Sequence, residues 1–363
     1  MKICRITRPP LEEFSTKFPQ REYYVLSRLE RRGHKIIQHK LHPVKIPNKY
    51  LSFGIGFLLS VIKFRKVKAD VIIADNIESA TAAIIIRIFF SIPFVFDFID
   101  DYSLIARYDA FKLRYYLIGF FEKLLPRFAD LIIVVDEHKR QFCMKIGIKK
   151  EKIILIPNGA DTEKFNPDIF SDEIIKNFAL ENCKIVLFIG KLNRYYRIET
   201  MIEAAPFVLK KFPDARFVLI GNGDNLRGLR RLCRRLKVDH AVLFTGFRPP
   251  EEIPRFIACA DVCVFPLPDS SALAIYEYMA CGKPTIVSDC STEKMGVSGD
   301  IIPDDCILKT TNSPQGFAEG INLLLEDREL RDQIGKKARQ FVETSYNWDE
   351  LASRYESALA LVC

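Results

Sequence analysis

Short apolar runs rich in β-branched residues recur along this chain, and spacers of helical length separate them. In the first half they lie near Ile36 and at 70–74, 94–96, 131–135 and 153–156. In the second half they lie at 185–190, 217–220, 242–244, 262–265 and 285–287. Apolar strands that alternate with helices are typical of a parallel sheet covered on both faces. The pattern therefore predicts two successive α/β sheets.

Two of the spacers show how helices are expected to cover the second sheet. The spacer 198–211 places its apolar side chains on one helical face, which predicts core positions. These are Ile198, Met201, Ile202, Ala205, Val208 and Leu209. The segment 226–236, LRGLRRLCRRL, alternates an apolar face with five arginines. We interpret the arginines as a solvated face, because nucleic-acid binding by such a helix calls for stacking aromatic side chains beside it.

The boundary between the two sheets is indicated by turn residues. Residues 157–183 carry Pro, Gly, Asn and Asp and lack a strand pattern, which predicts the connection between domains. We predict an N-terminal domain over 1–165 and a C-terminal domain over 166–345. The 363 residues, of which 48% are hydrophobic, are enough to bury two cores.

Cysteine and histidine usage argues against disulfides and metals. The ten cysteines are scattered, and the start of the chain does not resemble a signal peptide. We expect reduced, mostly buried thiols in a cytoplasmic protein. The five histidines show no ligand spacing with neighbouring carboxylates, so no metal is predicted.

Charge is distributed unevenly along the chain. Residues 1–160 hold 28 Lys and Arg against 16 Asp and Glu, and the remaining residues hold 26 against 30. Within the basic half, residues 49–68 and 111–128 combine apolar runs with cationic ends, but neither reaches the ~18 apolar residues of a membrane span. Both fit helices on an anionic membrane surface, and both equally fit helices that cover a sheet. We predict no nucleic-acid partner, and leave open a peripheral location at the inner face of the cell membrane.

The clearest chemical signal lies in residues 262–286. No G-x-G-x-x-G follows a strand and no G-x-x-x-x-G-K-[ST] occurs, which argues against dinucleotide enzymes and P-loop NTPases. Residues 262–286 instead read as a strand, a loop of small residues, a helix that starts near Ala274, and a second strand. The amides of Ser271, Ala272 and Leu273 are expected at the positive end of that helix, where a diphosphate is favoured.

Two carboxylates flank that loop. Asp269 precedes the predicted helix and Glu277 is expected in its first turn, so both can face one ligand. Sugar hydroxyls are natural partners for carboxylates. The alternative for Glu277 is a charge that complements the helix dipole.

This segment resembles the E-x7-E signature of retaining glycosyltransferases of family four. Further stretches agree in order and spacing: IPNGADTEKF at 156–165, GKL at 190–192, IGNGD at 220–224, FTGF at 244–247 and EYMACGKP at 277–284. The resemblance implies the GT-B fold, in which two Rossmann-like domains with parallel sheets face each other. It also implies that Glu277 binds the donor ribose and that Asp269, which replaces the usual Glu, contacts the transferred sugar.

The resemblance extends to the groups that hold the donor diphosphate. Lys191, after Gly190, stands at the Arg position of the family's G-R-L-x-x-x-K-G element, where it stabilises the charge on the leaving nucleotide. Tyr196 replaces the Lys of that element, so the second cation is expected from Arg197, with Arg194 as the other choice. Gly221 and Gly223 resemble the glycine turn that lets the nucleotide lie close, and they fit equally a tight strand–helix corner.

The first domain departs from the family pattern. Ile99 stands where the family has a His, so Asp100 or Asp101 is expected to orient the acceptor hydroxyl, or else to cap a helix. We take Asp269, Lys191 and Asp100 as the candidate catalytic residues. Residues 346–363 resemble the last helix of the family, which packs back on the acceptor-binding first domain.

These expectations combine into one function with two alternatives. The chain is expected to transfer a hexose with retention from a UDP- or GDP-sugar to a glycan or a lipid-linked acceptor, with no cofactor beyond the donor. A GT-B-like nucleotide-sugar epimerase is disfavoured because the first domain supplies few carboxylates and histidines for acid–base work. A non-catalytic relative that binds nucleotide sugars or glycans remains open because of Asp269, Tyr196 and Ile99.

Overall fold

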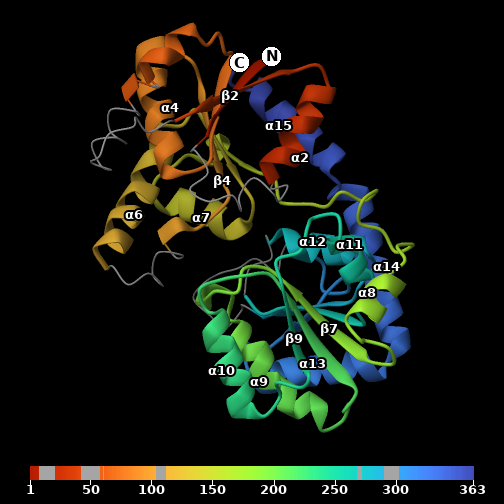
Figure 1. Cartoon of the computed structure of the whole chain (residues 1–363). Coiled ribbons are helices and arrows are strands. Elements are labelled where there is room, and N and C mark those ends of the chain that lie inside the picture. The colour runs from red at the N-terminus through yellow and green to blue at the C-terminus, as the bar shows by residue number, and fades with distance from the viewer. Residues whose placement is uncertain (8–20, 42–57, 60, 104–111, 268–271, 290–301) are drawn as a thin grey trace. The chain divides into compact units, whose positions relative to one another are not determined.

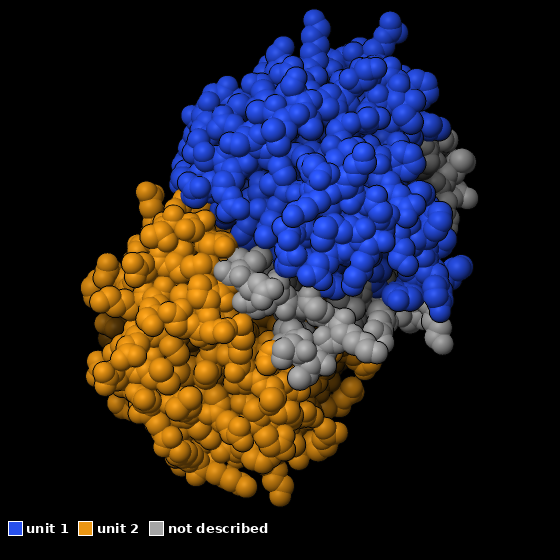
Figure 2. Space-filling model, turned by 180° about the vertical axis from the view of Figure 1, so that it is seen from behind, with its two compact units in different colours: residues 1–157, 349–363 blue, residues 158–348 orange. Residues whose placement is uncertain are grey.

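The computed structural model describes residues 1–7, 21–41, 58–59, 61–103, 112–267, 272–289 and 302–363. The chain forms two compact units, coloured separately in Figure 2. Unit 1 comprises Met1–Pro157 and Asp349–Cys363, and unit 2 comprises Asn158–Trp348. The chain thus passes between the units after Pro157 and again after Trp348, whereas the sequence placed the division at residues 165 and 345. The roles of the two units in binding acceptor and donor stay predictions.

Unit 1 contains a parallel six-stranded sheet in the order β2-β1-β3-β4-β5-β6. Its strands are β1 (Lys2–Thr7), β2 (Lys35–Lys40), β3 (Val71–Ala74), β4 (Phe94–Phe98), β5 (Leu131–Val134) and β6 (Ile153–Leu155). Every residue of β3, β4 and β5 is buried, because helices cover both faces of a parallel sheet. The parallel sheet is therefore confirmed, while β1 went unpredicted because Lys2 and Arg5 interrupt its apolar pattern.

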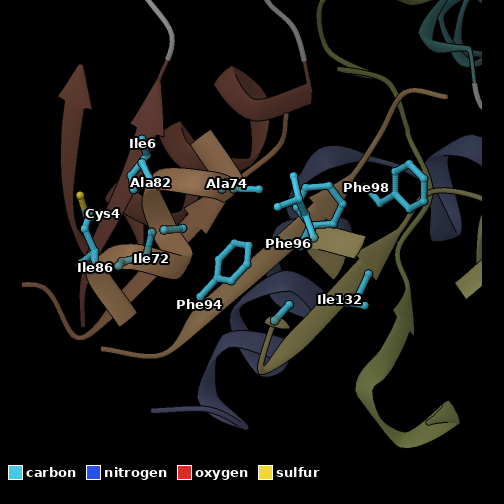
Figure 3. Packing of buried hydrophobic residues seen from close by; sticks show 14 of the residues in the cluster. Cys4, Ile6, Ile72, Ala74, Ala82, Ile86, Phe94, Phe96, Phe98 and Ile132 are labelled. Atoms are coloured by element: carbon cyan, nitrogen blue, oxygen red, sulfur yellow. The ribbon is translucent and has the colours of Figure 1, made fainter. Parts of the chain in front are cut away.

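Helices cover unit 1 on both faces of the sheet (Figure 1). α2 (Arg21–Arg31) and α15 (Trp348–Ala360) lie on one side, and ion pairs join Arg28 to Asp349 and Arg32 to Glu356. α4 (Ile77–Phe90), α6 (Lys112–Leu124) and α7 (Glu137–Lys145) lie on the other. This split follows from right-handed crossovers that leave β1 in opposite directions. Between the sheet and α4 lies the apolar core of Figure 3, which includes Ile72, Ile86 and Phe94.

Unit 2 contains a second parallel sheet, in the order β12-β11-β10-β7-β8-β9. Its strands are β7 (Lys184–Ile189), β8 (Ala215–Ile220), β9 (Val242–Gly246), β10 (Val262–Phe265), β11 (Thr285–Ser288) and β12 (Leu308–Thr310). Its helices are α8 (Asp172–Asn177), α9 (Ile198–Leu209), α10 (Leu226–Leu236), α11 (Ile253–Ala258), α12 (Leu273–Ala280), α13 (Pro314–Glu326) and α14 (Arg328–Ser345).

The predicted helices of unit 2 are confirmed. The residues predicted for the core of α9 are buried, except that Leu209 is only half-buried at its end. The arginines of α10 are exposed and its inward face holds Leu229, Leu232 and Cys233, as expected of a solvated amphipathic helix.

The strand orders locate the edge at which each unit can bind a ligand. Successive connections reverse direction between β1 and β3 in unit 1, and between β7 and β10 in unit 2. In open α/β sheets a crevice forms at such a switch point, beyond the carboxyl ends of the strands. Gly190 and Lys191 follow β7, and the start of α12 follows β10, so the predicted donor residues fall at the switch point of unit 2.

Candidate functional site

Two glycine-containing loops lie against each other at the carboxyl edge of unit 2. The amide of Gly190 donates to the Ile220 carbonyl at 3.0 Å, and the amide of Leu192 donates to Asn222 at 3.0 Å. A Cβ at Gly221, whose φ is +135°, would stand 1.9 Å from the Gly190 oxygen, and one at Gly223 would stand 2.2 Å from the Leu192 oxygen. These glycines are thus required for the close approach of the loops. Their contact with a nucleotide stays a prediction.

The loop after β7 presents cations at this edge. Lys191 and Arg194 are exposed, and within the described part of the chain neither side chain forms an ion pair. Arg197 is half-buried and takes the left-handed conformation, with φ 52°, where the 3₁₀ turn η4 (Arg194–Tyr196) meets α9. Lys191 is therefore available to an anionic ligand, and the two arginines remain alternatives for the second cation.

Tyr196, at the position where the family has a Lys, packs into an aromatic cluster. Its ring centroid lies 5.9 Å from Phe265 and 6.4 Å from Phe188, and the latter two rings stack at 5.9 Å. Phe188 and Phe265 stand near the ends of β7 and β10. The ring therefore covers the strand ends at the switch point, where a Lys would bring a positive charge.

The start of α12 differs from the other helix starts in its N-cap residue. Its N-cap is Ala272, and no side-chain hydrogen bond caps the described part of this helix end, whereas Asn76 caps α4 and Asp136 caps α7. The first amides of a helix that are not capped can bind an anion. Leu273 is the first helical residue, while Asp269 and Ser271 lie outside the described residues.

Glu277 lies deeper in α12 than the sequence predicted. Because the helix begins at Leu273, Glu277 is its fifth residue and belongs to the second turn, so the placement in the first turn was wrong. The side chain is half-buried, and burial raises its pKa to about 8, against the opposing effect of the Lys164 charge. A group held in this way is best stabilised by hydrogen-bond donors such as sugar hydroxyls.

Lys164, which the sequence analysis did not single out, is positioned by α14. Arg339 of α14 donates to the Phe165 carbonyl at 2.7 Å and to the Ala280 carbonyl at 2.6 Å. These bonds hold the segment that carries Lys164 against the end of α12. The NGADTEKF stretch therefore contributes a cation that acts on Glu277.

Tyr278 joins α12 to the end of β7. Its buried hydroxyl accepts a hydrogen bond from the Ile189 amide at 2.7 Å. The pairing of β10 with β7 extends only to Cys263 and Leu187, so the strands separate beyond this point and the hydroxyl fills the gap. This bond ties α12, at the residue after Glu277, to the residue before Gly190, a link for which the sequence carries no signal.

The carboxyl edge of unit 1 holds a cluster of charged groups. Arg5 Nη2 lies 2.5 Å from Asp75 Oδ2 and 3.1 Å from Glu22 Oε1. With Asp97 and Tyr355 these residues line a cavity with room for about one water molecule. Burial raises the pKa of Glu22 to about 7, although Arg5 opposes the shift. The expectation of few carboxylates in the first domain was therefore wrong at this edge, because parallel strands collect residues from distant positions.

A second set of buried polar side chains, around Asp97, lies beside the Arg5 cluster. Arg21 contacts Asp97 Oδ2 at 3.3 Å and donates to the Ile156 and Pro157 carbonyls at 2.9 and 2.7 Å. The Tyr355 hydroxyl donates to the same Asp97 oxygen at 3.1 Å. Asp97 therefore joins β4, the end of unit 1 at Pro157, and α15.

The two candidate acids after β4 differ in environment. Asp101 forms an ion pair at 3.1 Å with the buried Lys139, which also pairs with Asp136 at 2.7 Å. Asp100 is exposed, and Ile99 is half-buried. Of the two, Asp100 is the more exposed residue. Among the described residues, no group of three or more His, Cys, Asp or Glu is arranged to hold a metal ion.

Two family models cover most of the chain. Residues 13–164 match the model "Glycosyltransferase Family 4", and residues 170–341 match "Glycosyl transferases group 1". Among curated proteins, the uncharacterized glycosyltransferase MJ1607 of Methanocaldococcus jannaschii is 30% identical over 62% of this chain and 58% of its own length. The matched region thus spans less than two thirds of that relative.

Longer matches agree with this assignment. An N,N'-diacetylbacillosaminyl-diphospho-undecaprenol α-1,3-N-acetylgalactosaminyltransferase of Campylobacter jejuni is 27% identical over 98% of this chain and 93% of its own. The structure of Anabaena HepE in complex with UDP-glucose superposes with a TM-score of 0.80 and 18% identity, over 99% of this chain and all of that one. At that identity the superposition speaks for the fold alone. The chain belongs to the group 1, family 4 glycosyltransferases and has their GT-B fold.

Proposed function

We propose that this glycosyltransferase moves a hexose from a UDP- or GDP-sugar to a glycan or lipid-linked acceptor, with retention at the anomeric carbon. The observation that carries the proposal is the switch point of unit 2, where Lys191 follows β7, α12 with Glu277 follows β10, and the Tyr278 hydroxyl of α12 binds the Ile189 amide of β7. Free amides and a cation suit a diphosphate, and a half-buried carboxylate suits the hydroxyls of a ribose. The relatives support the choice of ligands, since HepE binds UDP-glucose and the Campylobacter enzyme is named for a diphospho-undecaprenol substrate.

In the proposed reaction the bond between the anomeric carbon and the diphosphate oxygen breaks. An acceptor oxygen forms its bond to that carbon on the same face, and the acceptor proton passes to the leaving phosphate. Lys191, with Arg197 or Arg194, stabilises the charge that develops on the nucleotide diphosphate. Asp269 is assigned to the transferred sugar and Asp100 to the acceptor hydroxyl. Cationic side chains supply the positive charge that stabilises the leaving diphosphate, so the proposed reaction requires no cofactor.

The test is nucleotide diphosphate release by the purified full chain. UDP-glucose, UDP-galactose, UDP-N-acetylglucosamine and GDP-mannose are supplied in turn, with and without a lipid extract as acceptor. We expect release with one nucleotide class, stimulated by the extract, and a loss of about a hundredfold in Glu277→Ala. Glu251→Ala, which removes an exposed carboxylate elsewhere in unit 2, is the matched control and should keep full activity.

Two results would redirect the proposal. Binding of a nucleotide sugar without release under any condition would indicate a non-catalytic relative. Conversion of the free nucleotide sugar into its epimer would indicate the epimerase, in which the Arg5 and Glu22 region becomes the place to look for acid–base groups. The anomeric configuration of the product, read by NMR, tests retention separately.

A further inference from the structure

Helix α6 in unit 1 exposes a row of large apolar side chains. Leu113, Tyr116, Leu117 and Phe120 recur at the spacing of one helical face and are 71%, 67%, 51% and 58% exposed. On the opposite face, Glu122 is 5% exposed and accepts a hydrogen bond from the Ser103 amide at 3.3 Å. A helix that covers a sheet turns its apolar face inward and its charges outward, as α10 does. Packing against the sheet therefore does not explain the apolar face of α6.

Neighbouring elements also expose apolar side chains. Helix α4, which contacts α6, exposes Ile88 and Phe89 at 65% and 75% near its own end. Phe64, in the 3₁₀ turn η1 (Phe64–Lys66), contacts Phe90 of α4 with ring centroids 6.2 Å apart. Just before that turn, Leu58, Leu59 and Ile62 are also exposed. Apolar side chains that gather at the surface of a folded domain, as on the exposed face of α6, mark interaction surfaces.

In the described part of the chain, several exposed charges beside α6 and the end of α4 are positive. Lys63, Arg65 and Lys66 are exposed beside the end of α4, and Lys123 and Arg127 are exposed at the end of α6. The carboxylate of α6, Glu122, is turned inward, and burial raises its pKa. Asp130, which follows α6, is engaged by Arg87 through two contacts of 2.6 Å. An apolar centre with a cationic rim complements the acyl boundary and the anionic headgroups of a bilayer.

We propose that the α6 face, defined as Leu113, Tyr116, Leu117 and Phe120 with the exposed residues at the end of α4, binds the surface of an anionic lipid bilayer. A second copy of the chain is the less favoured occupant, because it would bring two identical cationic rims together. No described helix is long and apolar enough to cross a membrane, so the contact is peripheral. The surface would bring the enzyme to a lipid-linked acceptor, and in that respect the inference rests on the proposed function.

The test is co-sedimentation of the full chain with extruded vesicles. Phosphatidylglycerol–phosphatidylcholine vesicles should bind the protein, and pure phosphatidylcholine vesicles should bind it more weakly. The double variant Leu117→Gln, Phe120→Gln should lose about tenfold or more in partition coefficient, because it removes apolar area from the contact. The matched control, Phe170→Gln with Phe207→Gln, removes exposed aromatic side chains of unit 2 and should bind as the wild type does.

A second pair of variants separates the electrostatic contribution. Lys123→Gln with Arg127→Gln should lower binding to the anionic vesicles by about fivefold per residue and leave binding to neutral vesicles unchanged. Thermal unfolding of every variant should match the wild type, since all the altered side chains are exposed. Equal binding of the wild type and the Leu117, Phe120 variant, or no binding of the wild type, overturns the inference. A wild-type dimer that the variant converts to a monomer, without vesicle binding, overturns it in favour of self-association.

Nucleotide diphosphate release from the donor is measured in the same protein preparations. Glu277→Ala should bind vesicles as the wild type does, while the α6 variant should retain donor-dependent nucleotide release in solution. Failure of the membrane inference therefore leaves the proposed function standing, and the reverse also holds.

Discussion

The two units share a parallel sheet with a switch point but differ in what stands there. In unit 2 the edge between β7 and β10 holds glycine backbone, an exposed Lys191 and the start of α12, whose N-cap is Ala272. In unit 1 the edge between β1 and β3 is filled by Arg5, Asp75 and Glu22 in mutual contact. The first edge offers donors to an incoming anion, and the second satisfies its charges internally.

The strand order of each sheet determines where a ligand can bind. The residues that stand at that edge determine which ligand can bind there. A phosphate needs unpaired amides and a cation, which glycine loops and a helix start provide. A buried ion-pair cluster is costly to open, because each charge that loses its partner remains desolvated. We therefore expect nucleotide to stabilise the protein through the edge of unit 2. At the edge of unit 1, we expect stability to change when one of the clustered charges is removed.

The largest expected effect comes from opening the ion pairs of unit 1. Asp97→Ala removes the carboxylate that contacts the guanidinium of Arg21, a side chain that is 1% exposed. We expect the free energy of unfolding to fall by about 3–5 kcal/mol. Urea unfolding measures the loss, and hydrogen exchange resolved by peptide should show it in β4 and α15.

Tyr355→Phe is the matched control for that variant. It removes one hydrogen bond to Asp97 and keeps the ion pair, so the expected loss is about 1 kcal/mol. If Asp97→Ala is no less stable than Tyr355→Phe, the ion pair does not hold this edge together and the contrast between the units is mistaken.

An intermediate effect is expected from the glycine loops of unit 2. Gly221→Ala sets a Cβ against the Gly190 carbonyl and strains a backbone with φ +135°, so stability should fall by about 2–3 kcal/mol. The displaced loop carries Lys191, so stabilisation of the protein by UDP or GDP in thermal unfolding should weaken as well.

Gly33→Ala is the matched control for Gly221→Ala, because it tests a positive φ without a steric clash. Gly33 also has a positive φ, +88°, but no atom lies within 4 Å of an added Cβ, so about 1 kcal/mol is expected. Equal losses in the two variants, with nucleotide stabilisation intact in Gly221→Ala, would show that the close approach of the loops matters to neither stability nor binding.

The smallest effect concerns pH. In the folded protein the pKa of Glu22 is raised from 4.5 to about 7, so the folded state binds more protons than the unfolded state within that window. The free energy of unfolding should therefore decrease as pH rises from 4.5 to 7. Glu22→Gln should flatten this dependence between pH 4.5 and pH 7.

The pH dependence of stability also tests Glu277 in unit 2. Its pKa is raised from 4.5 to about 8, so Glu277→Gln should flatten the fall in stability up to that higher pH. Urea unfolding between about pH 5 and pH 9 resolves the two windows. A pH dependence that neither variant alters would mean that other groups control the titration of both edges.

The sequence pattern predicted most of the fold. Ten strands were predicted from apolar runs, because a strand that is buried on both faces is apolar at nearly every position. The strands that it missed, β1 and β12, contain lysine or arginine and in β12 span only Leu308–Thr310. The helix that carries Glu277 was predicted, but its start was placed one residue late and its acid one turn early, since helix ends are weakly marked in sequence.

The candidate site was predictable where neighbouring residues form it and unpredictable where distant ones do. Gly190, Lys191, Leu273 and Glu277 lie in contiguous motifs, and the structure places them along one edge. Tyr278 binds Ile189 and the charge of Lys164 acts on Glu277, and no local sequence pattern predicts either interaction. The cluster of Arg5, Glu22, Asp75 and Asp97 escaped notice because its members come from four separate elements.

The sequence by itself determined the class of fold, the family and the loops that follow the strands, because apolar periodicity and local motifs depend on near neighbours along the chain. Tertiary structure alone decided which charges meet, which glycines bring two loops together and which face of α6 points outward. The periodicity of α6 marks a helix with two faces, but the buried Glu122 bound to Ser103 orients it. That contact joins residues 19 positions apart, and a pattern read within one helix cannot contain it.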